Sequence, residues 1–175
     1  MTVILVVFLV FFVLRLATLY ISIRNEKRIL AKGGIQYGKT VSAGLTLAHI
    51  AYYALCLYEA WKSVVLLDGC FYAGVVLMAF AYAVLFYVIY KLRDVWTVKL
   101  YILPQHRIET SWLFRGVRHP NYFLNIVPEL IGVGLLCHAW HVMVLGGPVY
   151  AVLLALRIVQ EEKAMKGMLP ALRKK

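Results

Sequence analysis

Two short polar stretches in an otherwise apolar sequence carry residue types that bind polar ligands. The first is Arg-His-Pro-Asn-Tyr at residues 118–122, directly before a long apolar run. Pro120 lacks an N–H group and suits the first turn of a helix, and it pushes His119 toward an extended conformation. The free amides of such a helix start favour a negatively charged ligand group. The stretch predicts either a plain basic helix start at the membrane surface or a ligand site.

The second stretch is RIVQEEKAM at residues 157–165. Arg157 and Glu161 are four residues apart, so their side chains can meet on one face of a helix. A guanidinium can also hold a carboxylate through two parallel hydrogen bonds. The alternative is that both side chains simply reach from a helix end to the lipid surface.

A third candidate lies on the helix that follows Pro120. Tyr122, Asn125, Glu129 and Gly132 have the spacing of one helix face. A carboxylate at Glu129, inside an apolar segment, is costly and has to face a cavity or a partner. It either takes part in chemistry or pairs with an arginine or tyrosine that holds the helices together. The preceding Pro128 removes a helix hydrogen bond and predicts a kink.

The composition indicates the environment of these residues. Of 175 residues, 63% are hydrophobic and only 15% are charged, which is typical of an integral membrane protein. The net charge of +11 comes from Lys and Arg in short loops between apolar runs. This pattern sets membrane topology and argues against a nucleic-acid partner.

Five apolar segments predict an all-α bundle of about five transmembrane helices that forms one domain over residues 1–175. Unpaired backbone groups are not tolerated in lipid, so each segment has to be helical. Every second loop is basic: residues 24–39, residues 91–118 and the C-terminal tail carry Lys and Arg, whereas the turns near 61–69 and 140–147 are nearly neutral. This alternation predicts that the N-terminus lies outside and the C-terminus in the cytosol. The predicted spans are residues 2–23, 41–60, 70–90, 121–140 and 141–160.

The fifth span is the shortest by this prediction. A helix that begins at Pro148 would hold only about 13 residues up to Gln160, or roughly 20 Å. We therefore expect the last two segments to form a tilted or partly re-entrant helical hairpin. The mixed stretch from Trp96 to Phe114 is expected to lie over the helix ends as a cytosolic cap, or on the lipid headgroups as a plain connector.

The remaining polar side chains predict packing rather than ligation. Cys56, Cys70 and Cys137 have no paired spacing and read as free thiols in apolar surroundings, and no zinc-type Cys/His cluster occurs in the sequence. No metal site is therefore predicted. His49, Tyr52 and Tyr53 in the second span are expected to pack between helices.

Taken together, these motifs resemble the isoprenylcysteine carboxyl methyltransferase family, and its small bacterial five-span members most of all. The resemblance covers most of the chain from Arg24 to Met165. The matching stretches are RNEKRILAKGG, WTVKLYILP, RGVRHPNY and RIVQEEKAM. The chain departs from the family pattern at Phe114, where Tyr is frequent, and at Leu124, where Gly is usual.

The resemblance implies transfer of a methyl group from S-adenosylmethionine to a lipid-like or prenylated acceptor at the cytosolic membrane face. It implies that Arg157 holds an acceptor carboxylate. A hydroxyl acceptor would need a base, for which His119 and Glu129 are the candidates. The residues implied in cofactor binding are Lys99, His106, Arg107, Ile108, Glu109, Phe114, His119, Pro120, Asn121, Tyr122 and Glu161.

Two alternatives to this reading stay open at the level of sequence. A phospholipid N-methyltransferase would use the same donor with an amine acceptor. A non-enzymatic membrane subunit or small transporter would use Glu129 and Arg157 as interhelical or pathway charges. The host membrane is the bacterial inner membrane or, in a eukaryote, the endoplasmic reticulum. The acceptor and the oligomeric state are not determined by the sequence.

Overall fold

The protein is an all-α, multi-pass membrane protein. The computed structural model describes residues 1–102, 117 and 119–172, with backbone alone for residues 167–172. Within these residues, four helices are long and apolar enough to cross a membrane, and a shorter apolar helix accompanies them. The long ones are Thr2–Ala31, Lys39–Lys62, Gly69–Val95 and Val142–Lys166, and the short one is Asn121–Leu136.

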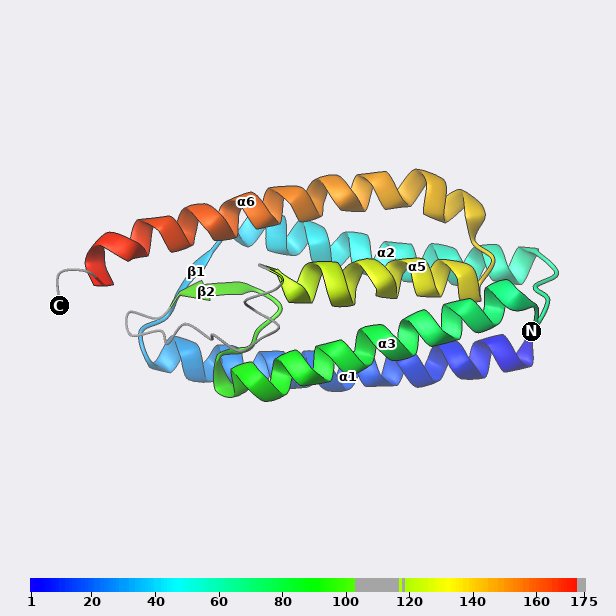
Figure 1. Ribbon diagram of the computed structural model, residues 1–175, viewed down its shortest axis with the longest axis horizontal. Coiled ribbons are helices and arrows are strands. Elements are labelled where there is room, and N and C mark those ends of the chain that lie inside the picture. Colours follow the sequence, from blue (N-terminus) through cyan, green and yellow to red (C-terminus); the bar gives the residue numbers. More distant parts are fainter. Residues whose placement is uncertain (103–116, 118, 173–175) are drawn as a thin grey trace.

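Successive helices run in opposite directions, and the two chain termini lie at opposite ends of the bundle (Figure 1). We call the end that holds the C-terminus and the two short strands the basic end, because Arg24, Lys27 and Lys39 lie there. The elements are α1 (Thr2–Ala31), β1 (Ile35–Tyr37), α2 (Lys39–Lys62), α3 (Gly69–Leu92), η1 (Arg93–Val95), β2 (Leu100–Ile102), η2 (Asn121–Ile126), α5 (Val127–Leu136), η3 (Val142–Gly146) and α6 (Gly147–Leu172).

The prediction that the fifth span is too short to cross the membrane is wrong, because the short helix is the fourth one. Pro148 does not begin a helix but lies within the continuous run of η3 and α6, which reaches Leu172. The turn before it, η3, is a π-helix, an adjustment that lets a helix absorb the missing proline N–H. By contrast, the sixteen residues of Asn121–Leu136 span only about 24 Å, less than a bilayer core of about 30 Å.

The same adjustment occurs at Pro128, where a kink was expected. The turn before it, η2, is also a π-helix, and the Val127 amide donates to the Tyr122 carbonyl. The last two segments are joined by a short turn over residues 137–139, yet α6 packs mainly along α2. Two prolines therefore reshape the start of both C-terminal helices without ending either of them.

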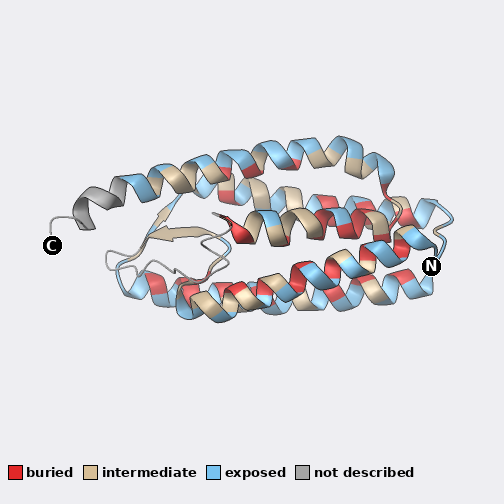
Figure 2. Ribbon diagram, viewed as in Figure 1, coloured by how far each residue is buried: buried red, intermediate tan, exposed pale blue. Residues whose placement is uncertain are grey.

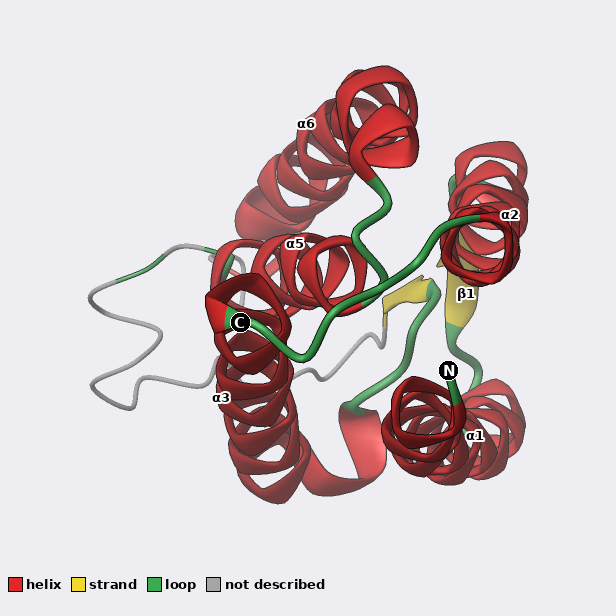
Figure 3. Cartoon of the chain, turned by 90° about the vertical axis from the view of Figure 1, so that its right-hand side faces the viewer, coloured by secondary structure: helices red, strands yellow, loops and turns green. Residues whose placement is uncertain are grey.

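The short helix α5 is covered by its neighbours over most of its surface. Viewed along the bundle, it lies between α3 and α6, with α1 and α2 on one side (Figure 3), and most of its residues are buried (Figure 2). It packs most closely against α3, where a Cβ on Gly74 would lie 2.7 Å from the Gly132 carbonyl oxygen. Small residues at such a crossing let two backbones approach in a membrane.

Two short antiparallel strands tie the loops together at the basic end. Strands β1 and β2 pair with Gln36 opposite Tyr101. The left-handed backbone of Gly38, with φ of 59°, then turns the chain from β1 into α2. This pairing holds the start of the predicted cap, up to Ile102, beside the loop between α1 and α2.

Candidate functional site

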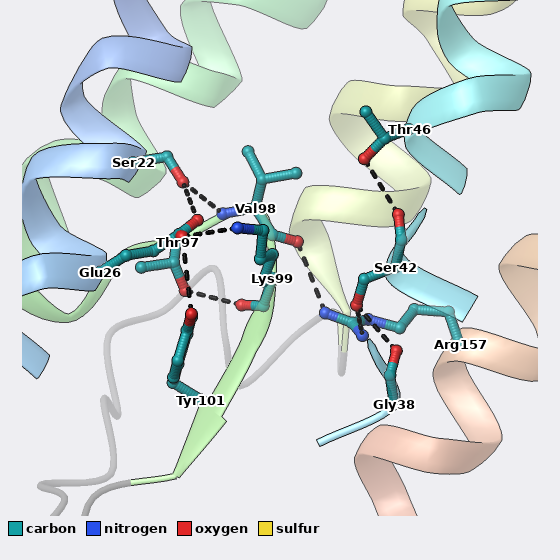
Figure 4. Close-up of polar contacts among 10 residues, drawn as sticks. All are labelled: Ser22, Glu26, Gly38, Ser42, Thr46, Thr97, Val98, Lys99, Tyr101 and Arg157. Carbon is teal, nitrogen blue, oxygen red and sulfur yellow. Dashed lines mark hydrogen bonds and ion pairs between the residues drawn. The ribbon is translucent and has the colours of Figure 1, made fainter. Parts of the chain in front are cut away.

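Arg157 is the centre of a polar cluster at the basic end. Its side chain is buried, with 2% exposure, although it carries a permanent positive charge. Its Nη1 donates to Ser42 Oγ at 2.8 Å, its Nη2 to the Val98 carbonyl at 3.4 Å, and its Nε to the Tyr122 hydroxyl at 3.4 Å. The first two contacts are drawn in Figure 4. Three separate elements, α2, the segment before β2 and η2, therefore converge on one guanidinium.

The Tyr122 hydroxyl links Arg157 to Glu161. It donates to Glu161 Oε2 at 2.6 Å while it accepts from Arg157. The expected meeting of Arg157 and Glu161 thus runs through a tyrosine. Among the residues that the structure describes, no carboxylate lies within salt-bridge distance of Arg157. Within the described part of the chain its charge is solvated only by neutral oxygens, which leaves the cluster suited to an anionic ligand.

His119 lies beside the same carboxylate. Its ring stacks on Tyr122, with 5.6 Å between ring centroids. Its Nδ1 is 3.6 Å from Glu161 and its Nε2 is 3.6 Å from Glu162. Nδ1 is buried without a hydrogen-bond partner among the described residues. The two polar stretches of the sequence are therefore brought together in space. We call Ser42, His119, Tyr122, Arg157 and Glu161 the Arg157 cluster.

The start of the helix after His119 contributes two side-chain amides, those of Asn121 and Asn125. Pro120 has helical backbone angles, and the Tyr122 amide already bonds the His119 carbonyl. Asn125 donates to Asn121 Oδ1 at 3.1 Å, but its own Oδ1 is buried and has no partner within the described part of the chain. Unpaired polar atoms of this kind are rare in folded proteins and call for a partner.

A groove of about 350 Å³ runs along α2 beside the cluster. Its polar end holds Gln36, Lys39 and Lys99, and its lining includes Ser42, the same hydroxyl that contacts Arg157. From Lys39 it continues along α2 to Ile50, about 16 Å toward the middle of the bundle. Ile50 is 62% exposed on a helix that faces lipid. The groove therefore connects the apolar flank of the bundle with the surroundings of Arg157.

Lys99 lies next to this groove and pairs with the first helix. Its Nζ is 2.7 Å from Glu26 Oε2. The hydrogen bond with Glu26 raises the pKa of Lys99 above its usual value. Lys99 is therefore charged at neutral pH and held in place, and its expected contact with a cofactor stays a prediction.

Five other expected cofactor residues belong to the predicted cap. They lie outside the described residues, so the structure places none of them. They are His106, Arg107, Ile108, Glu109 and Phe114.

Glu129 is not part of the Arg157 cluster. Its carboxylate is completely buried and lies 3.4 Å from Arg15 Nη1, 2.7 Å from the Tyr53 hydroxyl and 3.2 Å from the Tyr82 hydroxyl. His49 adds a contact at 3.7 Å. These partners come from α1, α2 and α3, which agrees with the alternative that Glu129 holds the helices together. We call these five residues the Glu129 cluster.

Sequence reasoning did not select three groups that complete the site. Ser42 and the Val98 carbonyl contact Arg157, and Glu26 anchors Lys99. A lone serine and a backbone carbonyl carry no signal in a single sequence. Glu26 did have one, since it lies in the RNEK stretch and is a carboxylate near the end of an apolar helix.

Two bacterial proteins are similar to this chain over most of its length. A protein of Haemophilus influenzae, described as uncharacterized, is 51% identical over 157 residues, which cover 90% of this chain and 91% of that protein. The uncharacterized protein YpbQ of Bacillus subtilis is 24% identical over 156 residues, covering 87% and 90%. No solved structure matches the chain.

A family profile matches residues 74–167, more than half of the chain. The match includes both polar stretches and every helix from most of α3 to the described part of α6. The chain thus belongs to the isoprenylcysteine carboxyl methyltransferase (ICMT) family of membrane methyltransferases.

Proposed function

We propose that the protein transfers a methyl group from S-adenosylmethionine to a carboxylate or hydroxyl oxygen of a lipophilic acceptor at the cytosolic membrane face. The observation that carries this proposal is the buried Arg157, which has no carboxylate partner among the described residues. Three of its five N–H groups have partners there, so one N–H on each terminal nitrogen is left. That pair suits the two oxygens of a carboxylate.

The polar groups around His119 fit the donor. S-adenosylmethionine carries an amino group, ribose hydroxyls and an adenine ring, which need acceptors, donors and a flat surface. Glu161 offers carboxylate oxygens, and the unpaired His119 Nδ1 and Asn125 Oδ1 offer further partners. The stacked rings of His119 and Tyr122 offer an aromatic face. These residues would hold the cofactor, together with Pro120 and Asn121.

The chemistry requires alignment more than proton transfer. When bound, S-adenosylmethionine supplies a methyl group on a sulfonium, which an oxygen can displace in line. Arg157 would hold the acceptor oxygen in position, and the apolar bundle would exclude water. A carboxylate is already ionised near neutral pH and needs no base. For a hydroxyl acceptor, the unpaired His119 Nδ1 would be our candidate for the base that takes the proton.

The groove along α2 supports a lipid-like acceptor. Its apolar part would take the chain of the acceptor, and Lys39 and Ser42 would lie near an anionic head. An amine acceptor is disfavoured, since a cationic ammonium would lie next to the charge of Arg157. The basic end would face the cytosol by the positive-inside rule. The bacterial relatives support a location in the bacterial inner membrane.

Transfer of label identifies the acceptor class. Membranes that contain the protein are incubated with S-adenosylmethionine labelled in its methyl group and with a lipid extract of the host. We expect label in an apolar component that is released by mild base, as a methyl ester is. A base-stable ether indicates the hydroxyl acceptor. Label on a phospholipid amine would contradict the proposal, as would no transfer to any component.

Binding of S-adenosylhomocysteine tests the cofactor site without an acceptor. We expect His119→Ala and Glu161→Ala to weaken binding by about tenfold or more, the effect of losing one charge-assisted hydrogen bond. Glu59→Gln is the matched control, because Glu59 contacts His141 at the opposite end. Wild-type affinity in both test variants would show that these residues do not bind the cofactor.

A further inference from the structure

The basic end of α1 forms hydrogen bonds and an ion pair with the segment that leads from α3 to β2. Asn25 Nδ2 donates to the Arg93 carbonyl at 2.8 Å and to the Trp96 carbonyl at 2.9 Å. One turn further along α1, Arg28 pairs with Asp94. These contacts dock the start of the segment on α1, far in sequence from α6.

A second set of contacts holds the next residues. Glu26 is buried to 8% exposure and accepts from Ser22 Oγ at 3.3 Å and from Lys99 Nζ at 2.7 Å. Ser22 Oγ in turn accepts the Val98 amide at 3.0 Å. The Tyr101 hydroxyl completes the set at 3.5 Å. Figure 4 shows these side chains converging on Glu26 from α1, from the segment before β2 and from β2 itself.

Val98 connects this set to Arg157. Its amide is held by Ser22, and its carbonyl accepts from Arg157 Nη2 at 3.4 Å. The two groups belong to one residue, so a shift of the backbone at Val98 moves the oxygen that faces the guanidinium. Figure 4 places Val98 between Glu26 on one side and Arg157 on the other.

We propose that Glu26 is a positioning residue for the Arg157 site: through Ser22 and Lys99 it fixes the Val98 carbonyl and so the direction of the guanidinium. This inference rests on the proposed role of Arg157 in holding the acceptor. The side chain of Arg157 is long and flexible, and its partners among the described residues are all neutral, so each contact that fixes the plane of the guanidinium contributes to its orientation. Glu26 acts on the acceptor without touching it.

Kinetics separate this role from a general loss of fold. We expect Glu26→Gln and Ser22→Ala each to raise the KM for the acceptor by about fivefold to tenfold, the cost of one lost oriented contact. The KM for S-adenosylmethionine should change less than about twofold, because its proposed partners do not contact Val98. The double variant should be no worse than either single variant, since both break the same link from Glu26 through Ser22 to Val98.

Arg28→Gln is the matched control. It removes an ion pair between the same helix and the same segment, but at Asp94 rather than beside Val98. We expect wild-type values of both KM constants. An equal rise of both constants in Glu26→Gln, together with a large loss of thermal stability, would overturn the positioning role in favour of a purely structural one.

Hydrogen exchange provides a readout that does not depend on activity. The peptide that covers residues 96–102 contains the Val98 amide held by Ser22. We expect faster exchange of this peptide in Glu26→Gln and in Ser22→Ala, and wild-type exchange in Arg28→Gln. Unchanged exchange in the first two variants would overturn the inference.

The two readouts also distinguish failure of the inference from failure of the proposed function. Faster exchange with a wild-type acceptor KM would overturn the positioning role while methyl transfer stands. If the wild-type protein transfers no methyl group, the proposed function fails. Faster exchange in Glu26→Gln would then still support the Glu26 anchor, and unchanged exchange would still overturn it.

Discussion

The bundle holds two buried polar clusters that differ in how completely each charge is matched. On α2 their members Ser42 and His49 are seven residues apart, about 10 Å along the helix. In the deeper cluster the Glu129 carboxylate is surrounded by a guanidinium, an imidazole and two hydroxyls. In the shallower cluster the Arg157 guanidinium meets only neutral oxygens among the described residues.

We propose that this difference separates a structural cluster from a binding site. A buried charge that has an opposite charge beside it links the helices that supply its partners. A buried charge without an opposite charge is unfavourable by itself and becomes favourable when a ligand brings that charge. On this proposal the Glu129 cluster links helices, and the Arg157 cluster is the one suited to an anionic substrate.

The largest expected effect is on Glu129. Replacement by Ala leaves the half-buried Arg15 without its carboxylate, which should destabilise the protein by about 3–5 kcal/mol. We expect poor yield and a much lower Tm in detergent. The double variant Arg15→Met with Glu129→Gln should be more stable than Glu129→Ala, because it no longer contains the unpaired charge of Arg15. A stable Glu129→Ala protein that binds cofactor but transfers no methyl group would break the comparison and make Glu129 catalytic.

The opposite outcome is expected at Arg157. Arg157→Met removes a buried charge that has no carboxylate partner among the described residues, so the Tm should stay the same or rise. Methyl transfer at low acceptor concentration should fall by about 100-fold or more, the loss of a bidentate charged contact. Arg157→Lys should be intermediate, since the charge remains without the planar fork. A collapse of the Tm in Arg157→Met would mean that both clusters are structural.

A smaller effect is expected at Tyr122, whose hydroxyl joins Arg157 to Glu161. Tyr122→Phe keeps the ring beside His119 and removes only this link. We expect affinity for S-adenosylhomocysteine to fall by about threefold to tenfold, as for one hydrogen bond to a charged group. Isothermal titration calorimetry measures this affinity. Tyr52→Phe is the control, because Tyr52 donates to the Leu130 carbonyl away from the cluster.

The smallest effect is expected at Asp68, which lies outside both clusters at the end of the bundle opposite the basic end. Its contribution to stability gives a reference against which the effects at the two clusters can be compared. Asp68 accepts from the Phe71 amide and lies 3.1 Å from His138. The Phe71 bond first, and then His138, lower the pKa of Asp68. A lowered pKa means that the contact stabilises above the usual pKa of Asp and is lost as the pH falls through the lowered value. Asp68→Ala should therefore lower the Tm slightly near pH 7 and not at all in strong acid. Thermal unfolding at several pH values measures this, and an equal difference at every pH would contradict it.

Much of the architecture follows from local sequence. Apolar runs near twenty residues specify helices in lipid because each run satisfies its own backbone hydrogen bonds. The spacing of Arg157 and Glu161 and the position of Pro120 are likewise local features, and they pointed to the two polar stretches that the structure brings together. The family resemblance was confirmed by the match over residues 74–167.

Proline was the feature that local reasoning misplaced. Pro148 was expected to begin a short fifth helix, whereas a π-helical turn lets the helix pass through it. Whether a proline ends a helix or is absorbed depends on neighbouring helices that satisfy the freed backbone groups. That information is not local to the sequence.

The sequence alone determined the membrane environment, the number of helical segments and the residue types available for a methyl-transfer site. Only the tertiary structure decided that Glu129 is matched by Arg15, that Arg157 is not matched by a described carboxylate, and that Glu26 reaches Arg157 through Val98. The reason is physical: the energy of a buried charge depends on every group within a few ångströms, and those groups come from helices far apart in the chain.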